Sequence, residues 1–534
     1  MADAGSDVTV VDSLEEKHES PLRLRLTLLG LSLLMLAVVL NTTSVSSALP
    51  TISHQINSSS VETFWVGTAA LICSTTFQPI YGTLANILGR KPVTGAAIAF
   101  FAIGTLIASQ ASNARTLLIA RAIQGLGSGG ISIVSEVILT DLVPLRQRGK
   151  YLACINSVWA VGSTSGPVIG AAFAQEITWR WIFYINLPLV ALGFGLMIVF
   201  TRLRSVPSSV RGNLRSLDYV GIVLFTGSIT SILIPLTWGG TMYAWDSWRT
   251  LTPLLIGTVA MVVFGVYERY IATNPVIPLS LFQTWTVIVT YIGTAMHGLI
   301  LYCGLYYLPF YFQAVKGYTP ILSGVALLPV TFTVVPGAMA TGIFISRTGK
   351  YRGSVWGGWT LLTLGLGIIC FLHLHTSNAL WIVSLVVIGI GLGMLFSALN
   401  LAVLAAACAN NPAQAAAAAT MFTFFRALGQ TLGVALGGTL FSNRVRAGLM
   451  SLPAHIQRLS PGTTDAVALV QLIDDISDPA SRAEVRTVYL NALRVVLGFM
   501  CAVAGASGLG SLIMRQYALS SRVNRDKEVE EARP

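Results

Sequence analysis

Residues 379–404 read ALWIVSLVVIGIGLGMLFSALNLAVL and contain no charged side chain. A helix of this length rises about 39 Å, which is enough to cross the roughly 30 Å hydrocarbon core of a bilayer. Lipid offers no hydrogen-bond partners to the backbone, so an apolar run that crosses it must satisfy its own amides as a helix. The stretch therefore predicts a transmembrane helix.

Apolar runs of similar length recur along the whole chain. The composition agrees, because 54% of the residues are hydrophobic and 10% are charged, whereas about a quarter of a soluble chain is charged. Boundaries at charges, prolines and glycines give fourteen predicted spans, which makes this an all-α polytopic membrane protein. The spans are 26–48, 63–85, 93–110, 116–138, 151–173, 181–201, 219–238, 251–270, 286–312, 323–345, 354–372, 379–404, 418–441 and 488–514.

The basic residues predict the orientation. The net charge of +11 comes from Lys and Arg scattered among the loops, which excludes a single nucleic-acid-binding face. Most of them fall in loops on the side that holds both termini, so the positive-inside rule places both termini in the cytoplasm. Residues 1–20 are acidic, which is the wrong sign for a cleaved signal peptide.

The chain also repeats itself. The first loop on the cytoplasmic side has the same spacing as the loop between spans ten and eleven: Gly82, Asn86, Gly89 and Arg90 match Gly342, Ser346, Gly349 and Lys350. Spans five and thirteen both carry glycine at every fourth position: Gly162, Gly166 and Gly170 match Gly429, Gly433 and Gly437. We therefore predict two parallel six-helix halves with two helices inserted between them.

This duplication divides the chain into five parts. They are a disordered cytoplasmic tail 1–25, a first half 26–201, a loop with the two inserted helices 202–285, a second half 286–514 with a long outer loop 442–487, and a cytoplasmic tail 515–534.

Three motifs in order resemble those of the major facilitator superfamily. Residues 82–91 (GTLANILGRK) resemble its cytoplasmic loop signature, 121–125 (RAIQG) its fourth-span motif, and 162–170 (GSTSGPVIG) its fifth-span antiporter motif. With WRWIFYINLP at 179–188, the chain is most similar to the fourteen-span drug:proton antiporters, especially fungal exporters of toxins and secondary metabolites. The resemblance extends from about residue 26 to about residue 515.

The resemblance implies a secondary active transporter that exports amphipathic small molecules, by proton antiport and alternating access, at the plasma membrane. We expect a monomer in the lipid bilayer that needs no cofactor or metal and is not an enzyme, since no phosphate-binding loop or metal motif occurs. Two alternatives stay open. One is a transporter of a nutrient, metal chelate or basic amino acid, with the vacuolar membrane as the alternative location. The other is a membrane sensor that binds a solute without moving it.

The resemblance also places candidate residues in the central cavity, which this superfamily builds mainly from spans one, four, nine and twelve. The candidates are Asn41, Arg121, His297, Tyr302, Tyr306 and Asn400. An arginine inside a span needs a partner or a wet cavity. Arg121 is therefore either a structural residue or a group that handles protons or substrate. Tyr302 and Tyr306 lie four apart on one helix face and are suited to stacking on a flat solute.

Proton coupling needs a titratable group within the membrane. Many relatives carry an acid in span one, where this chain has Asn41, and an aspartate in the loop signature, where it has Asn86. The remaining candidates are Glu136, Arg121 and His297. Glu136 is the preferred one because burial raises the pKa of a carboxyl group toward neutrality.

Two sets of residues are candidates for conformational change. The first is the loop signature with Gly82, Asn86, Gly89 and Arg90. The second is the face of Gly162, Gly166 and Gly170, which permits close helix packing, together with Pro167, which bends the span. Ordinary membrane packing is the alternative explanation for these glycines, and the resemblance favours the antiporter role.

Overall fold

A computed structural model describes residues 21–517 except 57, 59, 144, 202–216, 241, 274, 372, 375, 411–413, 454–469, 471, 472, 474, 475 and 477. Within these ranges the chain is almost entirely helical, and its one β-type contact is an isolated bridge between Gly239 and Tyr243. The α-helices are α1 (Pro21–Gln55), α2 (Ser60–Ile87), α3 (Arg90–Ser109), α4 (Ala114–Leu142), α5 (Leu145–Ala172), α6 (Trp181–Tyr184), α7 (Asn186–Phe200), α9 (Tyr219–Trp238), α10 (Trp248–Tyr270), α11 (Trp285–Phe310), α12 (Pro320–Val325), α13 (Leu328–Thr348), α14 (Arg352–Cys370), α15 (Asn378–Asn410), α16 (Ala415–Met450) and α19 (Pro479–Gly510).

The fourteen predicted spans are confirmed as helices. Among the described residues, eleven helical segments are long and apolar enough to cross a membrane. The three remaining long helices, α2, α5 and α16, are each at least 28 residues long and bring the number to fourteen. Of these three helices, α2 and α16 line the internal cavity described below.

Two predicted spans are interrupted and one predicted loop is shorter than expected. Span six consists of α6 and α7, and span ten consists of α12 and α13. Helix α16 continues to Met450, and α19 starts at Pro479, where the Asp478 side chain accepts hydrogen bonds from two backbone amides. Hydropathy detects only the part of a helix within lipid, so it places these polar extensions in the loop 442–487.

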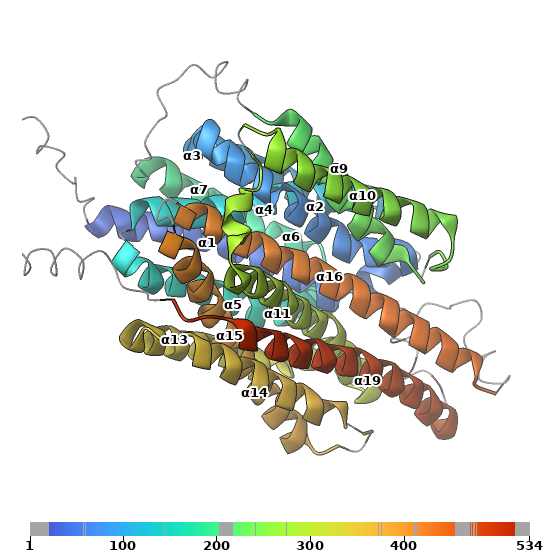
Figure 1. Ribbon diagram of the computed structural model, residues 1–534. Coiled ribbons are helices and arrows are strands. Elements are labelled where there is room, and N and C mark those ends of the chain that lie inside the picture. Colours follow the sequence, from blue (N-terminus) through green and yellow to red (C-terminus); the bar gives the residue numbers. More distant parts are fainter. Residues whose placement is uncertain are drawn as a thin grey trace, which may run out of the picture.

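Each half of the chain packs its helices in the same pattern. In the first half α1 packs on α5, and α4 packs on α2 and α3; in the second half α11 packs on α16, and α15 packs on α13 and α14. The halves meet where α2 lies against α16 and α5 lies against α13 (Figure 1). The repeat seen in the sequence is therefore a repeat of helix packing.

The inserted helices α9 and α10 lie outside the junction of the two halves. Helix α9 contacts both α2 and α16: the rings of Trp65 and Trp238 are 6.4 Å apart, and those of Phe225 and Phe424 are 5.7 Å apart. Helix α10 packs on the far side of α9. The inserted pair thus covers the seam between α2 and α16 on one side of the bundle.

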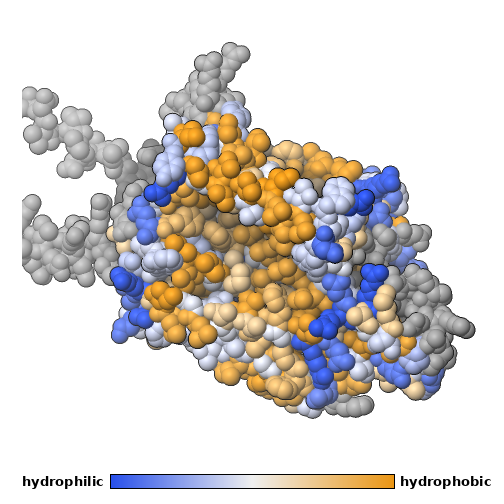
Figure 2. Space-filling view, turned by 45° about the vertical axis from the view of Figure 1, so that its right-hand side comes forward, coloured by the Kyte–Doolittle hydropathy of each residue, from blue (hydrophilic) through white to orange (hydrophobic). Residues whose placement is uncertain are grey.

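The outer surface is apolar where a lipid bilayer would contact it. A wide hydrophobic zone separates hydrophilic residues at the two ends of the bundle (Figure 2). Helix α10 contributes side chains that are more than half exposed, such as Leu255, Val259 and Val262. A soluble monomer rarely exposes so large an apolar surface, so this is a multi-pass integral membrane protein.

The chain enters α1 and leaves α19 at the same end of the bundle (Figure 1). The Tyr351 hydroxyl, between α13 and α14, donates a 2.6 Å hydrogen bond to the Arg515 carbonyl at this end. Below, this end is called the terminal end, and the opposite end is called the distal end.

Candidate functional site

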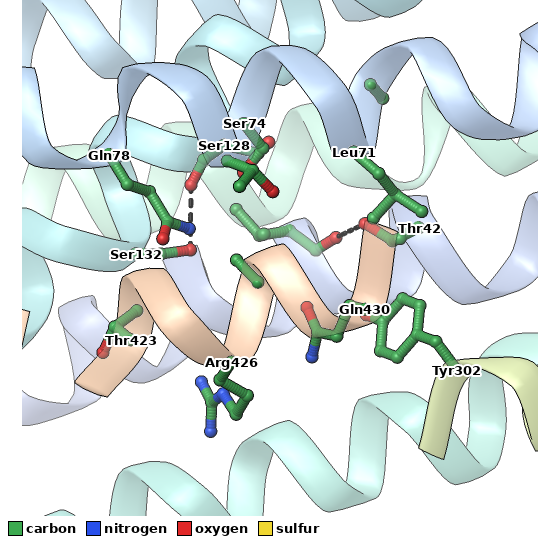
Figure 3. A pocket seen from close by; sticks show the side chains of 14 residues that line it. Thr42, Leu71, Ser74, Gln78, Ser128, Ser132, Tyr302, Thr423, Arg426 and Gln430 are labelled. Atoms are coloured by element: carbon green, nitrogen blue, oxygen red, sulfur yellow. Dashed lines mark hydrogen bonds between the residues drawn. The ribbon is translucent and has the colours of Figure 1, made fainter. Parts of the chain in front are cut away.

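A polar cavity lies between the two halves, near the middle of the helices that form it (Figure 3). Its volume of about 40 Å³ is room for about three water molecules. Its walls come from α1, α2, α4, α11 and α16, and are formed by Val38, Thr42, Ala70, Leu71, Ser74, Thr75, Gln78, Ser128, Ser132, Tyr302, Thr423, Arg426, Ala427 and Gln430.

The cavity walls contain hydroxyl and amide groups that are only partly satisfied. Thr42 and Ser132 donate to carbonyls of their own helices, each at 2.9 Å. The Gln78 Oε1 atom is buried and has no hydrogen-bond partner among the described residues. Since a buried polar atom without a partner is costly, the cavity is suited to water or to a polar group of a ligand.

Arg426 brings a full positive charge to this cavity. Its guanidinium lies over three aromatic rings, at 5.5 Å from the centre of Trp159, 4.9 Å from Phe396 and 5.9 Å from Phe422. An arginine at the bilayer centre costs about 2.5 to 3.5 kcal/mol, and one desolvated cation–π contact contributes about 2 kcal/mol. These rings, which we call the Arg426 cage, therefore stabilise the charge without accepting conventional hydrogen bonds from its N–H groups.

Glu136 joins the two halves on the terminal side of the cavity. Its carboxylate on α4 accepts a hydrogen bond from the Thr423 hydroxyl on α16. It also attracts Arg426 electrostatically, although no ion pair links the two residues. The carboxylate and the guanidinium are thus two opposite charges beside one cavity, each held by a different partner.

Contacts between the halves close the cavity on both sides. Toward the terminal end, a Cβ atom added to Gly82 of α2 would lie only 3.0 Å from the Thr420 methyl of α16. Toward the distal end, the Tyr306 hydroxyl of α11 donates a 3.4 Å hydrogen bond to the Thr42 carbonyl of α1. Ligand pockets usually have about 300 to 1,000 Å³, so this conformation is closed around a cavity too small for a drug-sized solute.

Of the six predicted cavity residues, Tyr302 lies in the cavity wall. Its ring stacks on that of Tyr306 at 6.3 Å, and Tyr306 lies on the distal side of the cavity. His297 is buried against α15, where its Nε2 atom is 3.1 Å from the Leu392 carbonyl oxygen. Asn41 and Asn400 are buried outside the cavity wall, and the Asn41 Oδ1 atom has no partner among the described residues.

Arg121 is completely buried within the first half. Its Nε donates to the Val66 carbonyl at 3.1 Å and its Nη1 donates to Gln124 Oε1 at 2.8 Å, while Gln124 in turn donates to Thr105. This network joins α2, α3 and α4. The Nη2 atom keeps no partner among the described residues. A structural role for Arg121 therefore explains the hydrogen bonds of its Nε and Nη1 atoms, but it does not explain why Nη2 is without a partner.

The glycines of α5 allow α1 to approach very closely. A Cβ atom added to Gly166 would overlap the Thr43 side chain, and one added to Gly170 would overlap the Ser44 carbonyl. The Ser47 hydroxyl donates a 2.7 Å hydrogen bond to the Pro167 carbonyl, which adds a polar contact between the two helices at this position.

The second half repeats this arrangement. On α16, Cβ atoms at Gly429 and Gly433 would overlap the carbonyl groups of Ala295 and Leu299 on α11. The glycine spacing shared by spans five and thirteen therefore has the same physical role in both halves, which is backbone contact with the first helix of that half.

Comparison with known proteins identifies the family. A family model described as "Major Facilitator Superfamily" matches residues 31–434. The chain belongs to the Major Facilitator Superfamily. Its fold is also similar to that of a bacterial homologue of the human lysosomal transporter Spinster, solved in an inward-facing and occupied conformation, with a TM-score of 0.57 at 14% identity over 92% of this chain and 97% of the other.

Members of the superfamily from fungi are similar over almost the whole chain. The "MFS transporter L2" of a Phoma species is 42% identical over 97% of this chain and 86% of the relative. The "Efflux pump FUS6" of Gibberella moniliformis is 34% identical over 98% and 93% of the two chains. The "Acurin A biosynthesis cluster MFS-type transporter" of Aspergillus aculeatus is 32% identical over 100% and 96%.

The loop signature of this superfamily member stabilises the terminal end of the first half. Gly89 has a positive φ of 92°, which favours glycine, and precedes the first residue of α3. Arg90 donates to Asp141 of α4 at 2.9 Å and to the Ala85 carbonyl of α2 at 2.8 Å. Asn86, where many relatives have aspartate, is exposed at the same end.

We expect Arg90→Ala to lower thermal stability more than Asp141→Asn does. Both variants lose the ion pair, which contributes about 1 kcal/mol or less because it is partly exposed, but Arg90→Ala also leaves the Ala85 carbonyl without its donor. Melting temperatures of the purified protein in detergent check this order, with the exposed Lys91→Ala as control. Equal melting temperatures for the two variants would contradict it.

The resemblance to the superfamily predicted cavity residues in spans one, four, nine and twelve. It did not predict most of the residues that form the cavity wall. Gln78 and Gln430 on α2 and α16 belong to it, and α15, the predicted twelfth span, contributes no residue to it. Arg426, inside the predicted thirteenth span, also belongs to this wall. The one local signal for its cage is Phe422, which lies one helical turn before Arg426 on the same face.

Proposed function

We propose that this protein exports amphipathic small molecules from the cytoplasm in exchange for protons. The relatives described as efflux pumps support the direction of transport, because they match over nearly their whole length. The position of the cavity supports alternating access, since its walls come from both halves and contacts between the halves close it on either side. Cargo would enter when the contacts at one end separate.

The main support for coupling of proton binding to transport is the hydrogen bond between Glu136 of the first half and Thr423 of the second. Opening of the terminal end has to break this bond. A charged Glu136 accepts the hydrogen bond from the Thr423 hydroxyl and attracts Arg426, whereas a protonated Glu136 loses the attraction for Arg426. Proton binding therefore weakens the contact between the halves, and separation of the halves exposes the carboxyl group to water, where it releases the proton.

The charge of Arg426 also helps to distinguish export from the alternative functions. A fixed arginine beside the cavity repels a cationic cargo, which disfavours a transporter of basic amino acids. We propose Glu136 rather than His297 as the proton carrier, because His297 contacts α15 of its own half. Arg121 is the second candidate, through its unpartnered Nη2 atom. The proposed location is the plasma membrane, and the proposed assembly state is a monomer.

Flux measurements in sealed vesicles test this function. Purified protein is reconstituted into liposomes that contain a fluorescent hydrophobic dye, and dye movement is followed with and without an imposed pH gradient. We expect the gradient to accelerate movement only in vesicles with protein. Movement that is independent of the gradient would refute proton antiport and leave a facilitator.

We propose that the terminal end faces the cytoplasm, and single cysteines test this orientation. Ser209 and Gly462 lie outside the described residues, in the loop after span six and in the loop before span fourteen. In a background without native cysteines, Ser209→Cys should react only with a reagent on the cytoplasmic side, and Gly462→Cys only with one on the outer side. Labelling of both from one side would refute the fourteen-span topology.

A further inference from the structure

We propose that the cargo carries an anionic group, such as a carboxylate or enolate, and that this group binds Arg426 within its aromatic cage. This inference rests on the proposed export function and adds the chemical class of the cargo. Three features carry it: the donors of Arg426 are free, its charge is not paired, and the neighbouring wall is suited to a flat organic anion.

The guanidinium of Arg426 has no hydrogen-bond acceptor in the described part of the chain, although Arg426 is one of the residues that line the cavity. The buried Arg121 and the half-buried Arg180 do have acceptors. Arg121 donates to Val66 and Gln124, and Arg180 donates to the Ala111 carbonyl. An arginine has five N–H donors in a planar fork that matches a carboxylate. At Arg426 this fork is available beside the cavity.

The positive charge is also not neutralised by a direct partner. The nearby carboxylate of Glu136 accepts its hydrogen bond from Thr423 and forms no ion pair with Arg426. The aromatic rings attract the cation through their faces, but they cannot replace a bidentate acceptor. A ligand anion would supply both the missing charge and the missing acceptor atoms.

The groups around Arg426 favour a flat anion over a simple inorganic one. Tyr302 and Gln430 lie in the same wall (Figure 3). The ring of Tyr302 stacks on that of Tyr306. The rings of Trp159 and Phe396 stack at 6.3 Å across the two halves. An aromatic acid would therefore find ring surfaces on both halves and one cation between them.

Binding of matched probe pairs tests this proposal. Full-length protein in lipid nanodiscs is titrated with radiolabelled naphthoate and its uncharged carboxamide, naphthamide, and with anthroate and its carboxamide. We expect the wild type to bind the carboxylate of at least one pair about tenfold more tightly than the amide, which corresponds to about 1.4 kcal/mol. Arg426→Gln should bind both members equally.

Two further variants separate recognition from folding. Arg426→Lys keeps the charge but loses the planar fork, so it should retain part of the preference. Arg446→Gln removes an exposed arginine of the same helix and should behave like the wild type. Equal affinity for acid and amide in the wild type, absence of carboxylate binding, or a preference that survives in a folded Arg426→Gln protein would each overturn the proposal.

Failure of this inference can be distinguished from failure of the export function. Gradient-driven dye flux without a preference for carboxylates would refute the anion site and leave the exporter intact. Carboxylate binding that depends on Arg426, without gradient-driven flux, would establish the site and refute proton-coupled export.

Discussion

Replacing Gly166 by leucine is expected to abolish export while much of the protein still reaches the membrane. Even a single Cβ atom at this position would overlap the Thr43 side chain, and a leucine would hold α5 away from α1. Extra methylene groups in a packed core typically cost about 1 to 3 kcal/mol. At a bend next to Pro167 we expect the displacement to prevent movement of the helix, and to reduce flux at least about tenfold.

Flux per reconstituted molecule, with protein quantified in the same vesicles, checks this expectation. Gly265→Leu on α10 is the matched control, because a Cβ atom there meets nothing within 4 Å. Gly433→Leu on α16 should behave like Gly166→Leu, since Gly433 is the matching glycine of the second half and a Cβ atom there would overlap the Leu299 carbonyl of α11. Transport at the wild-type rate in Gly166→Leu would show that the close α1–α5 contact is not needed.

Glu136→Gln is expected to keep cargo binding but to lose the acceleration of export by a pH gradient. A glutamine Oε1 atom still accepts the hydrogen bond from Thr423, so this bond between the halves is preserved while the charge and its titration are removed. A gradient of one pH unit supplies about 1.4 kcal/mol per proton, equivalent to a tenfold concentration ratio. The variant should transport at the same rate with and without this gradient.

Initial rates in vesicles at several imposed gradients measure this effect. Glu484→Gln, which changes an exposed acid on α19, is the control and should respond like the wild type. We expect His297→Gln to alter cargo preference more than coupling. A full response of Glu136→Gln to the gradient would reject Glu136 as the proton carrier. If the wild type itself ignores the gradient, the protein has lost coupling along with the span-one acid replaced by Asn41.

The number and position of the spans are determined by the sequence alone. Hydrophobicity over about 20 residues is a local property, and the bilayer sets the same length requirement for every helix. The interval 219–238 was predicted to the residue as α9, and 379–404 lies within α15. The glycine spacing likewise predicts close packing. Glycines at every fourth position lie on one helix face, and without side chains they let any neighbouring helix approach that face closely.

The cavity, its closure and the surroundings of each buried charge were decided only by the tertiary structure. The Arg426 cage combines Trp159 of α5, Phe396 of α15 and Phe422 of α16, and no local pattern indicates that residues of these three helices meet. The same holds for Glu136 and Thr423, which are 287 positions apart. Membrane helices share a similar apolar composition, so their sequences specify that they pack but contain little information about which polar residues face one another. That choice depends on how two six-helix halves fit together.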